Sequence, residues 1–226
     1  MTLIVGIVTQ MGAVMSADSA VHDDSGKFVK SICKITSIDN RFVIGISGRE
    51  SLHAVVKAIA GSEPTLQELK EDRRYRSRGG ANVRVLYEAI RDTHQFNINE
   101  GNRPKLTSRQ QQEILIIEPS GLVSRRAWKI VSRPERRTGV LVKKPGIEPI
   151  EDNCWHFVPY SQRTKELYET SGFTNRAVSN ADKSLEELLD EAQNRIRLAI
   201  QNNDDLKPPI HSVVVHPDGT QEWHKE

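Results

Sequence analysis

Three chemically reactive residues recur at equal intervals near the start of the chain, and this spacing constrains the fold more than any other feature. Thr2, Asp18 and Lys34 lie sixteen residues apart, each at an end or a bend of an apolar run. The runs are rich in isoleucine and valine, which favour strands, and Gly12 marks a turn between the first two. We therefore expect paired strands, with Asp18 at a strand end as a partner for Lys34.

The position of Thr2 indicates a specific chemistry. Removal of Met1 would give one residue both a hydroxyl and a free α-amine, with an amine pKa of about 7.7–8.0. Such an amine can accept the hydroxyl proton and so activate threonine as a nucleophile. An ammonium on Lys34 would lower the pKa of both groups, and Asp18 would keep Lys34 charged. The structural alternatives are a turn cap for Asp18 and a solvent-facing strand position for Lys34.

This stretch resembles the β-subunits of proteasomes and their bacterial relatives (HslV-like proteins), which are N-terminal-nucleophile hydrolases. With Thr2 laid on the family's catalytic threonine, Ala17-Asp18-Ser19 falls on its Ala-Asp-Ser signature and Lys34 on its catalytic lysine, without a gap. Gly12 falls on the first hairpin glycine. Gly48, which ends Gly45-Ile46-Ser47-Gly48, falls on the oxyanion glycine.

The resemblance implies an α+β fold, an αββα four-layer sandwich of two antiparallel sheets flanked by helices. Residues 1–226 would form a single domain, a length that is ample for a stable core. Apolar residues at helical spacing after Gly48 and around residues 83–90 predict two helices, and a capping box at Ser184–Glu187 predicts a third. Residues 28–37 and 41–47 are expected to form a hairpin around Asp39-Asn40, with Lys34 inside its first strand.

The resemblance also implies an activity, that of a threonine-type endopeptidase. Thr2 would attack after loss of Met1, Asp18 and Lys34 would tune it, and the backbone N–H of Gly48 would bind the oxyanion. The substrates would be peptides or unfolded proteins, degraded inside a homo-oligomeric ring built from helices and loops in the 50–100 region. An ATPase unfoldase is an expected partner, and no cofactor or metal is expected.

Family positions that contact substrate also transfer to this sequence by the same alignment. Backbone contacts would come from His22, Gly48 and Glu50, while side-chain selection would come from Val21, Ile32, Ile46 and Ala54. The resulting pocket is expected to be apolar and medium-sized. Ala20 and His22 replace the usual arginine and threonine, so the family's specificity does not transfer.

Composition indicates a soluble globular protein. The chain is 37% hydrophobic and 27% charged, and no apolar run approaches the roughly 20 residues of a membrane helix. Two cysteines do not make a disulfide framework, and the start of the chain does not resemble a signal peptide. A cytoplasmic protein is the simplest interpretation. The net charge of +2 is too small to argue for nucleic acid, and His22-Asp23-Asp24 lacks the later ligands of a calcium loop.

Two regions depart from the family pattern. Residues 129–152 lack the Gly-Ser-Gly whose serine supports the threonine amine, and only Ser132 is close in order. The same region carries Arg133, Arg136, Arg137, Lys143 and Lys144. Asp204 or Asp205 would be the aspartate that helps to hold the threonine, but the Ser-Gly-Gly expected after it is absent.

Three alternatives to a peptidase remain open. The first is an amidase or transamidase of the same N-terminal-nucleophile type acting on a specific substrate. The second is a non-catalytic ring subunit or scaffold that retains Met1, in which Thr2 has an amide nitrogen and no base. The third is nucleic-acid binding through the arginine-rich loops.

Overall fold

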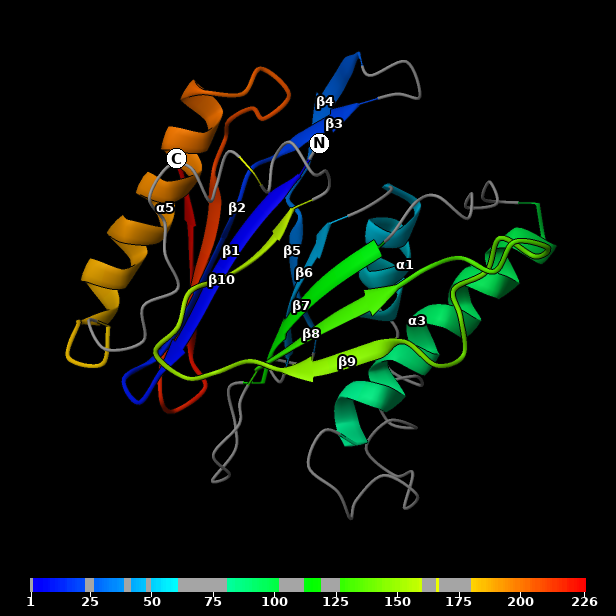
Figure 1. The fold of residues 1–226 in the computed structure, drawn as a ribbon, viewed down its shortest axis with the longest axis horizontal. Helices are drawn as coiled ribbons and strands as arrows, with labels where there is room; N and C mark the ends of the chain where they lie inside the picture. Colours follow the sequence, from blue (N-terminus) through cyan, green and yellow to red (C-terminus); the bar gives the residue numbers. More distant parts are fainter. Residues whose placement is uncertain are drawn as a thin grey trace.

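The fold is described from a computed structural model of the chain. The described residues are 2–22, 27–38, 42–47, 50–60, 81–101, 112–118, 127–159, 166 and 180–226. Met1 and Gly48, two residues on which the sequence-based mechanism depends, lie outside them. Within the described ranges the backbone forms three antiparallel sheets and three helices (Figure 1).

The first sheet contains both ends of the described chain. Its strands, in spatial order, are β10 (His156–Pro159), β1 (Leu3–Thr9), β2 (Gly12–Ala17), β11 (His211–Val215) and β12 (Gln221–Lys225). The β1–β2 hairpin that Gly12 predicts is confirmed, with Thr9 opposite Gly12 at its turn. Gly12 has φ +135°, and a Cβ there would lie 2.3 Å from the carbonyl oxygen of Val215, so only glycine fits this turn.

The second sheet is formed by the middle of the chain, and a short third sheet stands apart from both. The second has the order β5 (Ile35–Ile38), β6 (Phe42–Ser47), β7 (Gln112–Ile117), β8 (Ala127–Ser132) and β9 (Gly146–Pro149). The third pairs β3 (Ala20–His22) with β4 (Phe28–Ser31). In Figure 1 this small hairpin projects beside the N-terminus, at one end of the first sheet.

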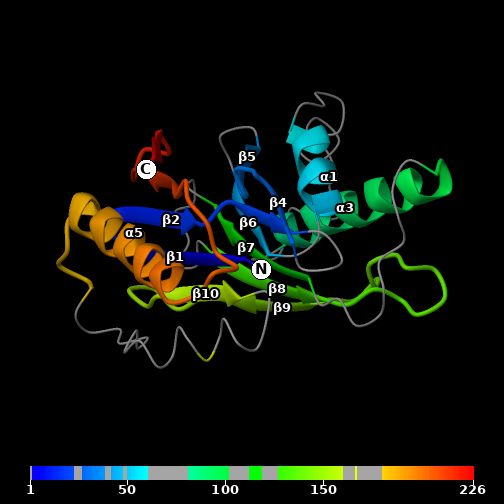
Figure 2. The same cartoon turned by 90° about the horizontal axis from the view of Figure 1, so that it is seen from above.

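The helices cover the outer faces of the two larger sheets. The helix α5 (Leu185–Gln201) packs on β1 and β2, while α1 (Glu50–Ala60) and α3 (Ala81–Asn99) pack against the second sheet. Figure 2 shows these helices on opposite sides of the molecule. The sequence-predicted helices at these three places are confirmed, including the capping box, in which Ser184 and Glu187 bind each other's backbone N–H groups.

The two larger sheets face each other across an apolar layer. Alternation along β1 sends Ile4 and Val8 into this layer, together with Leu115 and Ile117 of β7. Leu3, Val5 and Ile7 point the other way and pack under α5. Both faces of β1 are therefore buried, which explains why its apolar residues do not alternate with polar ones.

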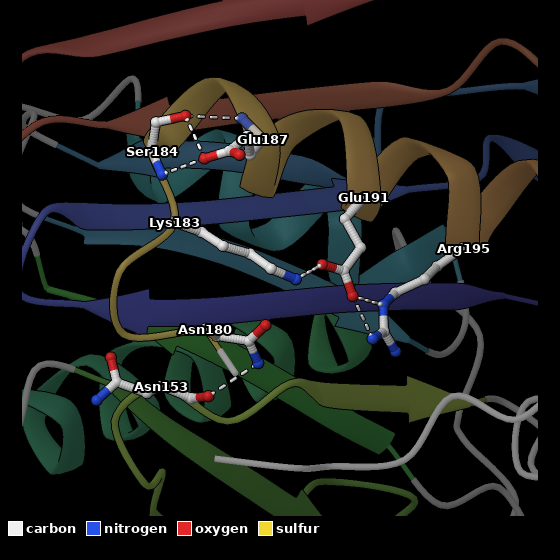
Figure 3. A network of polar contacts seen from close by, with 7 residues as sticks. All are labelled: Asn153, Asn180, Lys183, Ser184, Glu187, Glu191 and Arg195. Carbon is white, nitrogen blue, oxygen red and sulfur yellow. Dashed lines mark hydrogen bonds and ion pairs between the residues drawn. The ribbon is translucent and has the colours of Figure 1, made fainter. Parts of the chain in front are cut away.

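A polar network fastens the segment before α5 to the rest of the fold (Figure 3). Glu191 accepts hydrogen bonds from Lys183 and from Arg195, whose guanidinium also lies 4.6 Å from the centre of the Trp155 ring. The Asn180 side chain donates to the backbone oxygen of Asn153 at 3.0 Å. These contacts hold the two segments that flank residues 160–179 against α5.

The expectation of a four-layer αββα sandwich is wrong for the described residues. They form three sheets instead of two, because β3 and β4 pair with each other and not with the larger sheets. Only one described helix, α5, covers the first sheet, so the flanking layers are not equivalent. The described structure is sheet-rich, and the resemblance in the first 48 residues did not determine the layer arrangement.

The expected long strand around Lys34 is also wrong. Residues 28–31 pair with β3, and the chain then turns through 32–34 before β5 begins at Ile35. Lys34 precedes the strand instead of lying inside it, although its carbonyl oxygen still accepts from the N–H of Ile46. The break lets Lys34 turn inward while the residues of β4 remain exposed.

Candidate active site

Asp18 lies at the end of β2 with its carboxylate fully buried. One oxygen, Oδ1, accepts from the backbone N–H of Leu3 at 2.8 Å, and Oδ2 accepts from the N–H of Ala20 at 3.0 Å. The N–H of Asp18 in turn donates to the carbonyl oxygen of Leu3 at 3.2 Å. The carboxylate therefore binds the backbone immediately after Thr2 and also fixes the turn that follows β2.

Lys34 completes this arrangement. Its Nζ lies 2.9 Å from each oxygen of Asp18, and its side chain is 1% exposed. The ammonium and the N–H of Leu3 bind the same oxygen, so Lys34 lies directly beside the start of β1. Thus the sixteen-residue spacing does bring Asp18 and Lys34 together, next to the peptide that follows Thr2.

Thr2 is 3% exposed and lies one residue before β1. Alternation puts its side chain on the same face as Ile4, toward the second sheet. Ile4 packs on Gly45 of β6, where an added Cβ would lie 2.9 Å from Ile4 Cγ2. Gly45 pairs with Ile35, the residue after Lys34. The start of β1, where Thr2 lies, is therefore at the same end of the second sheet as Lys34.

Two effects shift the pKa of Lys34 in opposite directions. Burial lowers the pKa of the Lys34 ammonium, and the charge and hydrogen bonds of Asp18 act to raise it. Buried charges are stable only when they are paired and hydrogen-bonded. In this low-dielectric site, an ammonium on Lys34 would influence a neighbouring hydroxyl more strongly than in water.

His22, an expected substrate contact, lies within electrostatic reach of this pair. It is half-buried at the end of β3, and its ring meets Phe28 edge-on with centroids 6.1 Å apart. Burial lowers the pKa of His22 and Lys34 lowers it further, while Asp205 and Asp18 raise it. The structure therefore brings His22 and Asp205 to the same end of the molecule as Lys34.

The other expected substrate contacts are placed differently. Val21 and Ile32 are half-buried, on β3 and just before Lys34 respectively. Ile46 is 1% exposed and packs in the apolar cluster beneath α1. Glu50 begins α1, but its side chain is not described, and Gly48 is outside the described residues altogether.

Two polar side chains at this end were not singled out from the sequence. Ser47 ends β6 on the inner face and is 1% exposed, and its hydroxyl has no hydrogen-bond partner among the described residues. His53 of α1 is buried, and burial, with the charges of Lys34 and Lys57, lowers the pKa of His53 to about 3. Ser47 could have been found from its alternation with Val43 and Gly45, which places the three residues on one face of β6. The sequence does not show that this face is the inner one.

Of the supporting residues considered from the sequence, Ser132 lies away from Thr2, while Asp205 lies at the same end of the molecule as Lys34. The hydroxyls of Ser132 and Tyr87 lie 2.6 Å apart on the helix-covered face of the second sheet, so Ser132 cannot serve Thr2 on the inner face. Asp204 is exposed, whereas Asp205 is half-buried. The backbone oxygen of Lys207 accepts from the N–H of Ser19, which holds this loop beside the strand end of Asp18.

No metal site accompanies these groups. Among the residues that the structure describes, no cluster of three or more histidine, cysteine or acidic side chains has the geometry to hold a metal ion. Within the same residues, no helix is long and apolar enough to cross a bilayer. What the site offers is a hydroxyl, a buried ammonium held by a carboxylate, and a further hydroxyl without a partner.

Comparison with known proteins identifies solved structures with a similar fold. No family model and no curated protein matches the sequence. Solved structures of Anbu match nearly the whole chain: the Gly-1 mutant from Hyphomicrobium sp. strain MC1 has a TM-score of 0.64 at 13% identity, covering 100% of this chain and 87% of that one. Anbu from Yersinia bercovieri, described as an ancestral beta-subunit, has a TM-score of 0.61 at 9% identity, covering 99% and 86%.

A third solved structure adds information on assembly. The helical assembly of the Anbu complex from Pseudomonas aeruginosa matches with a TM-score of 0.59 at 14% identity, covering 99% of this chain and 86% of that one. At these identities the likeness shows the fold alone. The chain therefore has an Anbu-like fold.

Proposed function

We propose that this protein is a threonine peptidase of the N-terminal-nucleophile type, with Thr2 as its nucleophile after removal of Met1. One observation carries the proposal: a fully buried Asp18 binds both the Lys34 ammonium and the N–H of Leu3. Burying a charged pair costs several kcal/mol per ion before any attraction is counted. Its place beside the peptide that joins Thr2 to Leu3 is explained if it serves Thr2.

In the proposed reaction the α-amine of Thr2 takes the proton from its own hydroxyl, directly or through a water. The hydroxyl oxygen attacks the substrate carbonyl carbon, and the negative charge moves to the carbonyl oxygen, which the N–H of Gly48 would bind. The protonated amine then gives its proton to the leaving nitrogen as the C–N bond breaks. Water attacks the resulting ester, and a carboxylic acid leaves as the hydroxyl of Thr2 is restored.

The proposed role of Lys34 is electrostatic. A cation close to the hydroxyl lowers the pKa of the hydroxyl and of the amine, which brings both nearer to neutral pH. Asp18 keeps Lys34 charged despite burial and, through its bond to Leu3, fixes the backbone on which Thr2 stands. Asp18 is thus a positioning residue in this scheme.

We propose that Ser47 takes the role of the serine that supports the threonine amine in the family, a role that Ser132 does not fill. Its hydroxyl is buried and unpartnered, on the same face and at the same end of the second sheet as Lys34's entry into β5. A hydroxyl can both donate and accept, so it could bind the Thr2 amine in either protonation state. A buried polar group without a partner otherwise costs about 1–3 kcal/mol.

The wider setting is proposed from the fold. The likeness to Anbu, one example of which forms a helical assembly, supports a homo-oligomer that encloses its active sites. Peptides or unfolded chains would be the substrates, entering as an added strand, with an ATPase unfoldase as the partner that delivers them. Cys33 and Cys154 are free thiols, which agrees with action in the cytoplasm.

The test is reaction with a peptide epoxyketone, which forms its stable ring only with a hydroxyl and an amine on the same residue. We expect intact mass to show loss of Met1, and peptide mapping to place the adduct on Thr2. Thr2→Ala should abolish the adduct, whereas Thr9→Ser, which keeps a hydroxyl at a buried strand end, should retain it. A protein that retains Met1 and gives no adduct would overturn the proposal in favour of a non-catalytic subunit.

A second assay separates the two enzymatic alternatives. Fluorogenic peptides are incubated with and without an added amine, and the products are identified by mass. Hydrolysed peptide supports the peptidase, while a ligated amide as the main product would indicate a transamidase. A protein that forms the adduct but cleaves no peptide in the panel would indicate an amidase for a specific substrate.

A further inference from the structure

A basic hairpin and an acidic face lie at opposite ends of the molecule. The basic hairpin comprises residues 133–144, between β8 and β9; the acidic face comprises the loop 151–153 and residues 182–190 at the start of α5. In Figure 1 these regions occupy the two ends of the longest axis, and Figure 2 places them at opposite ends as well. Neither region belongs to the site around Asp18 and Lys34.

The basic hairpin is an ordered structure and not a solvated tail. Backbone bonds run from Glu135 N to Val140 O at 2.8 Å and from Val142 N to Arg133 O at 3.2 Å. Leu141 is fully buried in the cluster beneath the helices. The Tyr87 hydroxyl donates to the carbonyl oxygen of Val142 at 2.7 Å, and burial raises the pKa of Tyr87 to about 12, so this donor keeps its proton.

The cations of this hairpin point outward. Its exposed basic side chains are Arg133, Arg136, Arg137, Lys143 and Lys144. Within the part of the chain that the structure describes, Arg136, Arg137, Lys143 and Lys144 form no ion pair. Glu135 is the one acid among them, and its carboxylate accepts from Thr138 at 3.2 Å. A rigid scaffold that holds unneutralised cations apart from their own chain is suited to bind an anionic surface.

The acidic face is equally well held. Its exposed acids are Glu151, Asp152, Asp182, Glu186, Glu187 and Asp190. The N–H of Asn153 donates to the carbonyl oxygen of Val8 at 2.7 Å, and Asn180 binds Asn153, which fixes the loop beside the start of α5. The neighbouring cation Lys183 is already bound to Glu191 (Figure 3).

Each end also exposes one large apolar side chain. Met11, in the β1–β2 turn beside the start of α5, is 52% exposed; Phe96, near the C-terminal end of α3 and on the side of the basic hairpin, is 62% exposed. The turn lies against α5, because a Cβ on Gly12 would meet Leu185 at 3.1 Å. Apolar anchors surrounded by complementary charge are typical of specific protein interfaces.

We propose that the basic hairpin of one copy of this chain binds the acidic face of the next copy. The two surfaces differ and lie at opposite ends, so the contact is head-to-tail and leaves a free surface of each kind on every growing assembly. Repetition of such a contact closes a ring or continues as a helix, depending on the rotation between copies. The inference does not depend on the proposed peptidase activity.

The test exchanges charges between the two surfaces and measures mass in solution at about 0.15 M salt by sedimentation velocity. One variant carries Arg136→Glu and Lys144→Glu, and a second carries Glu186→Lys and Asp190→Lys. We expect each alone to weaken the contact on the order of a hundredfold, since like charges then face each other, and to sediment as smaller species. A matched control with Arg84→Glu and Lys225→Glu, two exposed cations elsewhere, should assemble as the parent does.

Mixing the two variants gives the decisive result. In the mixture each reversed surface faces a complementary one, so assembly should return with the two variants alternating, as native mass spectrometry would show. A chain that carries all four changes should assemble alone. Variants that assemble normally on their own, or a mixture that stays small, would overturn the inference. Co-purification of nucleic acid that is lost with the hairpin variant, with assembly unchanged, would assign the hairpin to nucleic acid instead.

Discussion

Two clusters in this molecule each pair acidic with basic side chains, but they differ in how far they are exposed to solvent. Asp18 and Lys34 are completely enclosed, and every oxygen of the carboxylate accepts two hydrogen bonds. Lys183, Glu191 and Arg195 join the segment before α5 to the helix itself (Figure 3), and the side chains of Lys183 and Glu191 are 32% and 27% exposed. The first cluster meets the start of the chain, whereas the second meets a connecting segment.

The comparison teaches where a functional explanation is needed. A partly exposed network can hold two segments together at little cost, because water still reaches its charges. A fully buried pair costs more to desolvate, and an apolar pair of similar size is often as stable or more stable. The enclosed pair is therefore better explained by chemistry at Thr2 than by stability, and the network is explained by stability alone.

The largest expected difference concerns activity. Lys34→Met should lower peptide hydrolysis on the order of a thousandfold, as loss of a group that sets the pKa of a nucleophile does. Glu191→Gln should leave the same rate unchanged. The measurement is kcat/KM with a fluorogenic peptide, at a temperature where circular dichroism shows both variants folded. Equal losses in the two variants would remove the distinction between the clusters.

The next difference concerns stability. Asp18→Asn leaves the Lys34 ammonium buried without its counter-charge and should cost about 3–5 kcal/mol of unfolding free energy. Burial already lowers the pKa of Lys34, and loss of Asp18 lowers it further. The unfolded chain then binds more protons than the folded one, so the variant should regain stability as pH rises from 7 toward 10. Urea titrations at several pH values would test this, and a loss independent of pH would contradict it.

His53 should give the site an acid sensitivity that the outer network lacks. Burial, aided by Lys34 and Lys57, lowers the pKa of His53 to about 3, below its ordinary 6.5. The contribution of neutral His53 to the free energy of unfolding is therefore fully present above pH 6.5. It is lost as pH falls toward 3, by about 2 kcal/mol between pH 7 and pH 5. We expect His53→Leu to flatten this part of the pH–stability curve. An unchanged slope in the variant would show that other groups cause it.

Ser47→Ala should have a smaller effect, about tenfold on kcat/KM, if its hydroxyl binds the Thr2 amine. The hydroxyl has no partner within the described part of the chain, so its removal should not destabilise the fold. The informative readout is the acid limb of the pH–rate profile, which should shift in the variant because the amine loses a hydrogen bond. A rate loss that merely follows a loss of stability would assign Ser47 to packing.

The smallest effect is expected in the network itself. Burial of Glu191 acts to raise the pKa of its carboxyl, but the hydrogen bonds and charges of Lys183 and Arg195 together lower it. Glu191→Gln should cost about 1 kcal/mol at pH 7, and the difference from the parent should shrink below pH 4.5 as the parent's carboxylate is protonated. Thermal unfolding at both pH values would measure it. A cost of 3 kcal/mol or more would make this network resemble the enclosed pair.

The sequence predicted the contact between Asp18 and Lys34 but not the layer arrangement. The contact between Asp18 and Lys34 was expected from placing Asp18 at a strand end as the partner of Lys34, and the structure shows it at 2.9 Å. The break at residues 32–34 was not predicted, since whether β4 pairs with β3 or continues into β5 depends on tertiary contacts. The supporting serine could not be placed from the sequence for a similar reason: the order of Ser132 in the chain said nothing about which face of β8 it occupies.

The most direct measurement uses one double variant, Asp18→Asn with Lys34→Met, which removes both charges and keeps the side chains close to their original size. We expect its unfolding free energy to stay within about 3 kcal/mol of the parent, because no buried charge is left unpaired, while peptide hydrolysis falls on the order of a thousandfold. A folded double variant that cleaves peptides at the parental rate would contradict the claim that the buried pair serves Thr2.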